Sequence, residues 1–276
     1  MPSVSQRLYS PSRFAATSAP LFAPLRATLL AVFCLGTLLV APARADGLTD
    51  LKAALARLQG QTPLKALVEV NTKNRSGDGK DQEESQGRAA VTVEDSARGL
   101  QVLYSHELMT RLENEEYAKE KDPKAKTPTV TALREFSSNE LRPMVSGAAS
   151  LLRRMEKAVF KSEKAQDYNG KPARLLSFEI PIESLGEKER KYIKKFEGLL
   201  EIWIGSDGTP LASRSLTNVS GRALVVISFE TKNEDQSVYG LAGDRLIMLR
   251  KESRNSGSGA GEKGESHTVK TLQLQS

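Results

Sequence analysis

The chain is poor in the side chains that most often carry chemistry. Its 276 residues include one cysteine, two histidines and one tryptophan, and aromatic residues make up only 5% of the sequence. The cysteine, Cys34, lies in an N-terminal leader, so the rest of the chain has no thiol for catalysis, a disulfide or a metal site. His106-Glu107 begins like a zinc-protease helix, but Thr110 stands where that motif needs its second histidine.

Other functional motifs are missing as well. The sequence has no Gly-x-Ser-x-Gly elbow, no phosphate loop and no dinucleotide fingerprint. The acidic residues between positions 78 and 84 lack the spacing of a calcium loop. Glutamates flank and interrupt the basic run Lys188–Lys195, as on a solvated helix face. We therefore expect no catalytic residues, no metal, no cofactor and no nucleic-acid partner, and an enzyme is the least favoured class.

The positive charge of the chain comes mainly from its N-terminus. The formal net charge is +6, but residues 1–45 contain four arginines and no lysine, aspartate or glutamate. Without this leader the number of basic residues falls from 40 to 36, against 34 acidic ones. A chain so nearly balanced has little electrostatic bias toward nucleic acid.

The leader has the three parts of a secretory signal peptide. The basic residues 1–26 precede the uncharged apolar run Ala27–Ala41, and Ala43-Arg44-Ala45 supplies the small residues that a signal peptidase requires. The apolar run is shorter than the roughly 20 residues that span a bilayer as a helix. Cleavage is therefore favoured over an uncleaved membrane anchor.

The leader also indicates where the protein works. Lipoprotein processing needs a small residue before the cysteine, and Phe33 precedes Cys34, so we expect no lipidation. We predict cleavage after Ala45, export to a bacterial periplasm, and no transmembrane segment in the mature protein. An organelle import signal is a minor alternative because the basic part is unusually long.

The first part of the mature chain predicts one helix followed by a meander of strands. Leucines recur at helical spacing over residues 48–58, and Leu64–Thr72 alternates apolar and polar side chains like a half-buried strand. After a polar loop over Asn74–Gln86, residues 88–94 and 100–104 continue as strands. Three strands therefore follow the first helix.

The middle of the chain predicts helices. Glu107–Lys121 is highly charged with a narrow apolar stripe, and an exposed connection with two prolines follows it. Met144–Met155 has a clear apolar face, and Arg153, Arg154 and Lys157 gather at its C-terminal end, where the helix dipole favours cations. We expect one continuous helix there.

The last third is rich in strands. The turn sequences Asn169-Gly170 and Ser206-Asp207-Gly208-Thr209 predict two hairpins. Strands are predicted over Val159–Tyr168, Arg174–Ile180, Leu199–Gly205, Leu211–Val219, Ala223–Thr231 and Val238–Arg250. A basic helical stretch is expected over Ser184–Phe196. The Gly/Ser-rich segment 251–276 predicts a flexible tail, with a possible final edge strand at Thr268–Leu274.

Strands that outnumber helices, without alternation of single strands and helices, favour an α+β fold. We predict a curved antiparallel sheet, or incomplete β-barrel, covered by a few helices. This half-barrel-like domain occupies residues 46–250 and follows the signal peptide, residues 1–45.

The order of these elements resembles that of the periplasmic outer-membrane lipoprotein carrier superfamily. The segment Gly198–Gly208 reads G-x-L-x-I-W-I-x-x-D-G, and the resemblance covers most of Leu48–Val238. It implies an incomplete barrel lidded by helices around an apolar cavity that holds acyl chains. The charged insertion near Glu113–Thr131 and the Gly/Ser-rich tail depart from the family pattern.

One face of the predicted sheet is the candidate ligand site, because an apolar concave face must be covered by helices or by a ligand. The candidate ligand-binding residues are Leu176, Phe178, Ile180, Leu200, Ile202, Ile204, Met144 and Met155. We expect a non-enzymatic periplasmic carrier or sensor of an apolar or acylated ligand. The alternative is a structural or adaptor protein of the envelope, whose core is fully packed and which binds another protein.

The export prediction has a direct test. N-terminal sequencing of the protein purified from the periplasm should begin at Asp46, because signal peptidase cuts after the small residue Ala45. Protein that keeps residues 1–45 and stays with the membrane fraction would instead support an uncleaved anchor.

Overall fold

The computed structural model describes residues 46–79, 82–223 and 227–275, so the expected signal peptide lies outside the described residues. Within them, ten strands form one antiparallel sheet in the order β3-β2-β1-β10-β9-β8-β7-β6-β5-β4. The strands are β1 (Leu64–Ser76), β2 (Glu83–Ser96), β3 (Gly99–Leu103), β4 (Val159–Ala165), β5 (Arg174–Glu179), β6 (Ile193–Ile204), β7 (Pro210–Ala223), β8 (Ile227–Ala242), β9 (Arg245–Gly259) and β10 (Glu262–Leu274). The edges, β3 and β4, do not meet. The α+β class and an open antiparallel sheet are confirmed.

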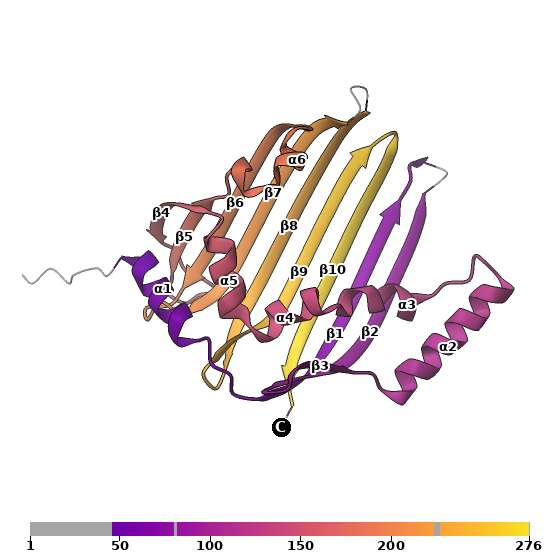
Figure 1. Ribbon diagram of the computed structural model, residues 1–276, viewed down its shortest axis with the longest axis horizontal. Helices are drawn as coiled ribbons and strands as arrows, with labels where there is room; N and C mark the ends of the chain where they lie inside the picture. The colour runs from indigo at the N-terminus through magenta and orange to yellow at the C-terminus, as the bar shows by residue number, and fades with distance from the viewer. Residues whose placement is uncertain (1–45, 80–81, 224–226, 276) are drawn as a thin grey trace, which may run out of the picture. The chain divides into compact units, whose positions relative to one another are not determined.

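The helices lie mainly on one face of the sheet, which we call the inner face; the opposite one is the outer face (Figure 1). The helices are α1 (Gly47–Arg57), α2 (His106–Lys121), α3 (Pro128–Leu133), α4 (Ser138–Val145), α5 (Gly147–Met155) and α6 (Glu187–Arg190), with the 3-10 turns η2 (Arg134–Phe136) and η3 (Ile182–Ser184). Figure 1 shows α3, α4 and α5 crossing the strands, and η2 lies between α3 and α4 in the chain. We call these four segments the helical band. α2 extends away from the sheet beside β2.

Both predicted hairpins are present, and their turn residues adopt the conformations that those sequences favour. Asn169 and Gly170 have φ angles of 50° and 74° between β4 and β5, as in a type I′ turn. Gly208 has a φ of 80° between β6 and β7. A side chain at Gly208 would also meet the backbone of Asp50 in α1, so the turn packs closely against that helix.

The helical band corrects the prediction of one continuous helix over Met144–Met155. α4 ends at Val145, and Ser146 leaves the helical conformation, with φ −136° and ψ 61°. α5 begins at Gly147, where a side chain would lie 3.1 Å from the carbonyl oxygen of Leu246 in β9. Close approach to the sheet therefore divides the expected helix into two short ones.

Strand pairing also extends into segments expected to be helix or loop. β6 begins at Ile193, so the basic stretch Ser184–Phe196 contains only the four-residue α6. β1 and β2 remain paired as far as Ser76 and Glu83, within the expected polar loop. In both places the neighbouring strand decides the conformation, because strand preference depends strongly on context.

The prediction of a flexible tail over 251–276 is wrong. β9 continues to Gly259, and β10 lies in the middle of the sheet, between β1 and β9. Thr72 and Thr268 face each other across β1 and β10 and share a buried hydrogen bond of 2.8 Å. Main-chain hydrogen bonds hold β10 on both sides, and the composition of residues 251–276 does not reveal them.

The inner face changes character along the strands. Beneath the helical band it is apolar, and it forms one core cluster with the helices. Nearer the hairpin tips, inner-facing side chains of β1, β2, β9 and β10 are polar: Asn74 donates to Ser85, and Asn255 donates to Ser266. Main-chain pairing and polar contacts, and not an apolar core, therefore hold this half of the sheet.

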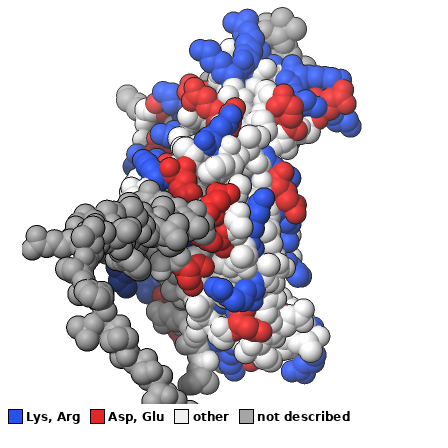
Figure 2. Space-filling view, turned by 90° about the vertical axis from the view of Figure 1, so that its left-hand side faces the viewer, with Lys and Arg blue, Asp and Glu red and all other residues white. Residues whose placement is uncertain are grey.

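The edge strand β4 is exposed along most of its length. Val159 is 51% exposed, and Lys161 pairs with Glu179 of β5 at 2.5 Å. Figure 2 views this side of the protein and shows basic and acidic side chains intermingled on it. Charged side chains on an edge discourage pairing with a foreign strand.

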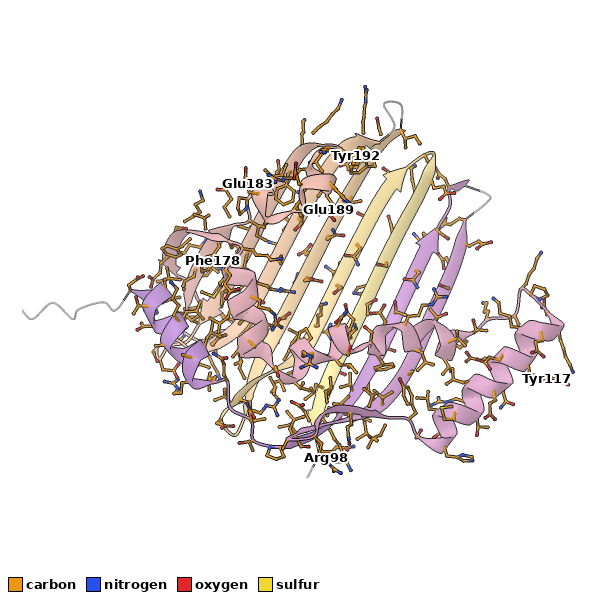
Figure 3. The ribbon with its side chains drawn as sticks, viewed as in Figure 1. Arg98, Tyr117, Phe178, Glu183, Glu189 and Tyr192 are labelled. Carbon is orange, nitrogen blue, oxygen red and sulfur yellow. The ribbon has the colours of Figure 1, made fainter. Side chains whose placement is uncertain are left out.

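Adjacent residues of β5 provide a matched test of the inner face. Phe178 is 2% exposed and packs edge-to-face on Phe160, with ring centroids 5.5 Å apart; Figure 3 shows it beside α5. Phe178→Asp would bury an unpaired carboxylate and should lower the free energy of unfolding by about 4 kcal/mol or more. Ser177→Asp, on the outer face, should cost about 1 kcal/mol or less. Urea unfolding measures both, and equal losses would contradict the assigned faces.

Candidate functional site

Seven of the eight residues predicted to bind an apolar ligand lie together in the core cluster. They are Leu176 and Phe178 of β5, Leu200, Ile202 and Ile204 of β6, Met144 of α4 and Met155 of α5. Each is at most 9% exposed. The eighth, Ile180, is only partly buried and lines a separate hollow with Ile182 and Phe196. The site therefore lies between the sheet and the helical band, with Ile180 at its border.

The other half of the cluster comes from strands that sequence reasoning did not assign to the site. β1 and β2 contribute Val68, Val70, Val91 and Val93, each at most 1% exposed, and β9 contributes Met248. The alternation of these valines is visible in the sequence. Their place opposite the helical band depends on β10 pairing with β1, which no local pattern indicates.

A buried charge cluster ties the helical band to the sheet. Lys270 of β10 is 2% exposed, and its Nζ lies 2.5 Å from Glu140 of α4 and 2.9 Å from Glu135 of η2. Lys251, the neighbour of Lys270 on β9, lies 3.4 Å from Glu140. Two ammonium groups thus balance two carboxylates. A lysine this deeply buried requires such partners.

The charge cluster makes the attachment of α4 sensitive to pH. Burial alone would raise the pKa of the Glu140 carboxyl, but the hydrogen bond from Lys270 and the charges of Lys251 and Lys270 outweigh it. The pKa of Glu140 therefore lies below its ordinary value of 4.5. The stabilisation is present above that ordinary value and is lost as the pH falls through the lowered pKa.

A second buried cation lies where several segments meet. Arg245 of β9 is 4% exposed, and its guanidinium donates to the carbonyl oxygens of Thr62 at 2.9 Å and Val145 at 2.8 Å. It also pairs with Asp95 at the end of β2. A hollow of about 210 Å³ adjoins it, lined by residues 58–61 after α1, by the end of β2, and by Ala148 and Ala149 of α5. The hollow therefore lies at the border of the cover, beside the first turn of α5.

The helical band is built from short helices. α3, α4 and α5 have 6, 8 and 9 residues. Isolated helices below about 12 residues are marginal in water, so contacts with the sheet keep these ordered. The break at Ser146 separates α4, which the buried Lys270 holds, from α5, which packs by apolar contacts and by one ion pair of 3.5 Å between Arg154 and Asp235 of β8. The Arg154–Asp235 pair is about 30% exposed, and partly exposed pairs contribute less, so α5 is held mainly by its apolar contacts.

Comparison of the chain with known protein families, curated proteins and solved structures finds no match. In the described part of the chain, no three His, Cys, Asp or Glu side chains come together as ligands for a metal ion. Nor do the described residues include a helix long and apolar enough to cross a membrane. The resemblance to lipoprotein carriers therefore stays a hypothesis based on the sequence pattern.

The role of Glu140 in the charge cluster can be tested by comparing a variant with wild type at neutral and at acidic pH. Glu140→Gln should lower the free energy of unfolding at neutral pH by about 1–2 kcal/mol, because Lys270 loses its nearest carboxylate and partial exposure of Glu140 limits the effect. The difference from wild type should shrink as the pH falls below the ordinary glutamate value of 4.5 and through the lowered pKa of Glu140, because wild-type Glu140 then becomes protonated. Glu113→Gln, on exposed α2, should change stability little at either pH. A deficit of Glu140→Gln that is independent of pH would contradict the role assigned to Glu140.

Proposed function

We propose that the protein is an exported, non-enzymatic binding protein that holds an apolar or acyl-bearing ligand between the sheet and the helical band. It would act as a lipid or lipoprotein carrier, or as a sensor of such a ligand. One observation carries the proposal: a continuous apolar cluster on an open sheet lies beneath a cover of short, separately attached helices.

The chemistry of the cluster selects the class of ligand. Its buried side chains are aliphatic, aromatic or thioether groups, and such a surface gains free energy by removing hydrocarbon from water. Met144, Met155 and Met248 contribute flexible, polarisable side chains that adapt to ligands of varied shape. An acyl chain can replace contacts between α5 and the sheet with similar apolar contacts, so the cost of opening is partly offset.

The attachment of the cover suggests how it opens. α4 stays fixed to β10 through Lys270 and Glu140, while α5 follows the break at Ser146 and has only the partly exposed pair of Arg154 with Asp235 of β8 to release. Movement of α5 would widen the hollow beside Arg245 and Ala149, which is too small as it stands for a lipid. We infer that a ligand enters there.

An adaptor role in the envelope is the second candidate, and the edge strands favour it. β3 and β4 each leave one side of their backbone without a neighbouring strand in the sheet. Leu103 and Val159, on these edges, are 43% and 51% exposed. A partner protein could add a strand at β3, which has no charged side chain, while the core stays closed; the charged side chains of β4 disfavour this at the other edge.

The two functions predict different masses for the purified protein. Native mass spectrometry of protein prepared gently from the periplasm should show a reproducible additional mass that extracts as lipid or lipopeptide. Ligand-free protein should take up a fatty acid when challenged. A clean mass without uptake would contradict the carrier function and favour the adaptor.

A matched pair of variants tests the proposed entry. Ala149→Trp should fill the hollow beside Arg245 and reduce fatty-acid uptake by about tenfold, equivalent to ~1.4 kcal/mol. Ala118→Trp, on exposed α2, makes the same substitution away from the cover and should leave uptake unchanged. Uptake that is equal in the two folded variants would rule out entry beside Arg245.

A further inference from the structure

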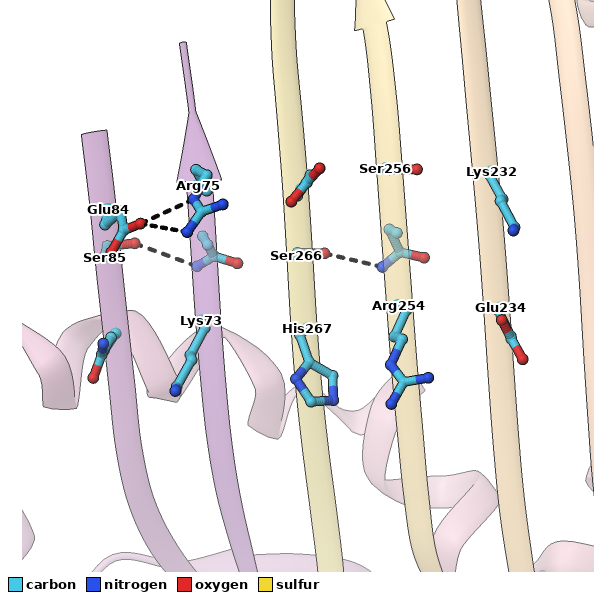
Figure 4. A pocket seen from close by; sticks show the side chains of 14 residues that line it. Lys73, Arg75, Glu84, Ser85, Lys232, Glu234, Arg254, Ser256, Ser266 and His267 are labelled. Atoms are coloured by element: carbon cyan, nitrogen blue, oxygen red, sulfur yellow. Dashed lines mark hydrogen bonds and ion pairs between the residues drawn. The ribbon is translucent and has the colours of Figure 1, made fainter. Parts of the chain in front are cut away.

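A second hollow, of about 440 Å³, lies across β2, β1, β10, β9 and β8 in the half of the sheet nearer the hairpin tips. It is on the outer face, which the register shows. A side chain on Gly87 of β2 would meet α3 at 2.7 Å, so Gly87 and its partner Thr72 point inward, and the next residue, Lys73, points outward. Figure 4 shows the hollow with the helices behind the sheet.

Three basic side chains stand in one row across the floor of this hollow. Lys73 on β1 is the register partner of His267 on β10, and His267 is the partner of Arg254 on β9; Figure 4 shows them side by side. Bases directly opposite each other destabilise a sheet when charged. Stability therefore does not account for this row.

The acids nearby leave the row with spare positive charge. Arg254 and His267 share one carboxylate, that of Glu252, at 2.5 and 3.0 Å, and Arg250 binds the same carboxylate at 2.8 Å. The carboxylate of Glu234, at the end of the row, is occupied by Arg214 at 2.8 Å.

Two lysines at the hollow lack acidic partners. Among the described residues, neither Lys73 nor Lys232 forms an ion pair. The lining as a whole has four lysine and arginine side chains against three glutamates, besides His267. Of these, Arg75 and Glu84 neutralise each other at 2.7 Å. Glu265 of β10, the register partner of Arg75, is the one lining glutamate that forms no ion pair among the described residues. Lys73 and Lys232, at opposite sides of Arg254, therefore exceed the unpaired acids of the lining by one positive charge.

We propose that this outer hollow binds a phosphate group, carried by an anionic lipid headgroup or by a soluble phosphate ester. Lys73 and Lys232 supply point charges on either side, and Arg254 supplies a guanidinium between them. A phosphate accepts several charge-assisted hydrogen bonds at once, which suits donors spread over adjacent strands. The described lining contains no phenylalanine, tyrosine or tryptophan, the larger rings on which bases and sugar rings usually stack. The site lies on the face opposite the apolar cluster, so it does not depend on the function proposed for that cluster.

The test distinguishes binding of phosphate at this site from nonspecific attraction of anions to the net positive charge of the protein. Mature wild-type protein is titrated calorimetrically with glycerol phosphate and co-sedimented with vesicles of phosphatidylglycerol or phosphatidylcholine. The double variant K73Q/K232Q should bind more than about tenfold more weakly, because both point charges are gone. The control K52Q/K171Q removes the same charge from exposed positions elsewhere and should bind within about twofold of wild type.

The outcomes assign or reject the site. Binding of glycerol phosphate identifies a soluble ester as ligand, and binding only to phosphatidylglycerol vesicles identifies a lipid headgroup. Wild-type protein that binds neither, or equal weakening in the two double variants, would overturn the proposal. K73Q/K232Q should unfold at the same urea concentration as wild type or a higher one, because neither lysine has an ion pair to lose.

Discussion

The position of β10 between β1 and β9 is the constraint on which the rest of the structure depends. This strand joins the N-terminal meander to the C-terminal strands, and without it the chain would contain two separate sheets. Its inner face carries Thr268, Lys270 and Leu272 beneath the helical band, and its outer face carries His267. One strand thus aligns the apolar cluster, the attachment of α4 and the basic row of the outer hollow.

Two kinds of interaction, apolar burial and buried ion pairs, position the helical band on the sheet. Apolar burial supplies most of the driving force, but it is not directional and would tolerate a shifted helix. The contacts of Lys270 with Glu135 and Glu140, and of Arg245 with Asp95, require particular positions of η2, α4 and β2 relative to the sheet. Buried ion pairs contribute little net stability compared with apolar residues of similar size. Their role here is to fix the register of the cover.

The sequence was informative wherever a local rule decides the conformation. Asn169-Gly170 specifies its own turn. The core residues of β5 and β6 could be assigned to one face because every second side chain over residues 176–178 and 200–204 is a buried apolar one. Prediction from the sequence failed where contact with a segment distant in the chain determines the local conformation. The Gly/Ser-rich end of the chain looks flexible until β1 and β9 pair with it, and the helix break at Ser146 follows from contact between Gly147 and β9. The outer hollow was missed for the same reason, because Arg254 and His267 lie in the segment expected to be a tail, and Arg75 and Glu84 in one expected to be a loop.

The central place of β10 also sets the order in which the protein can be completed. Ala66, near the start of β1, pairs with Leu274 of β10, so β1 lacks one neighbour until β10 has been synthesised. Contacts between such distant residues slow folding, because a long loop must close before they form. A nascent chain therefore keeps an open edge on β1 until β10 has been synthesised and can pair with it.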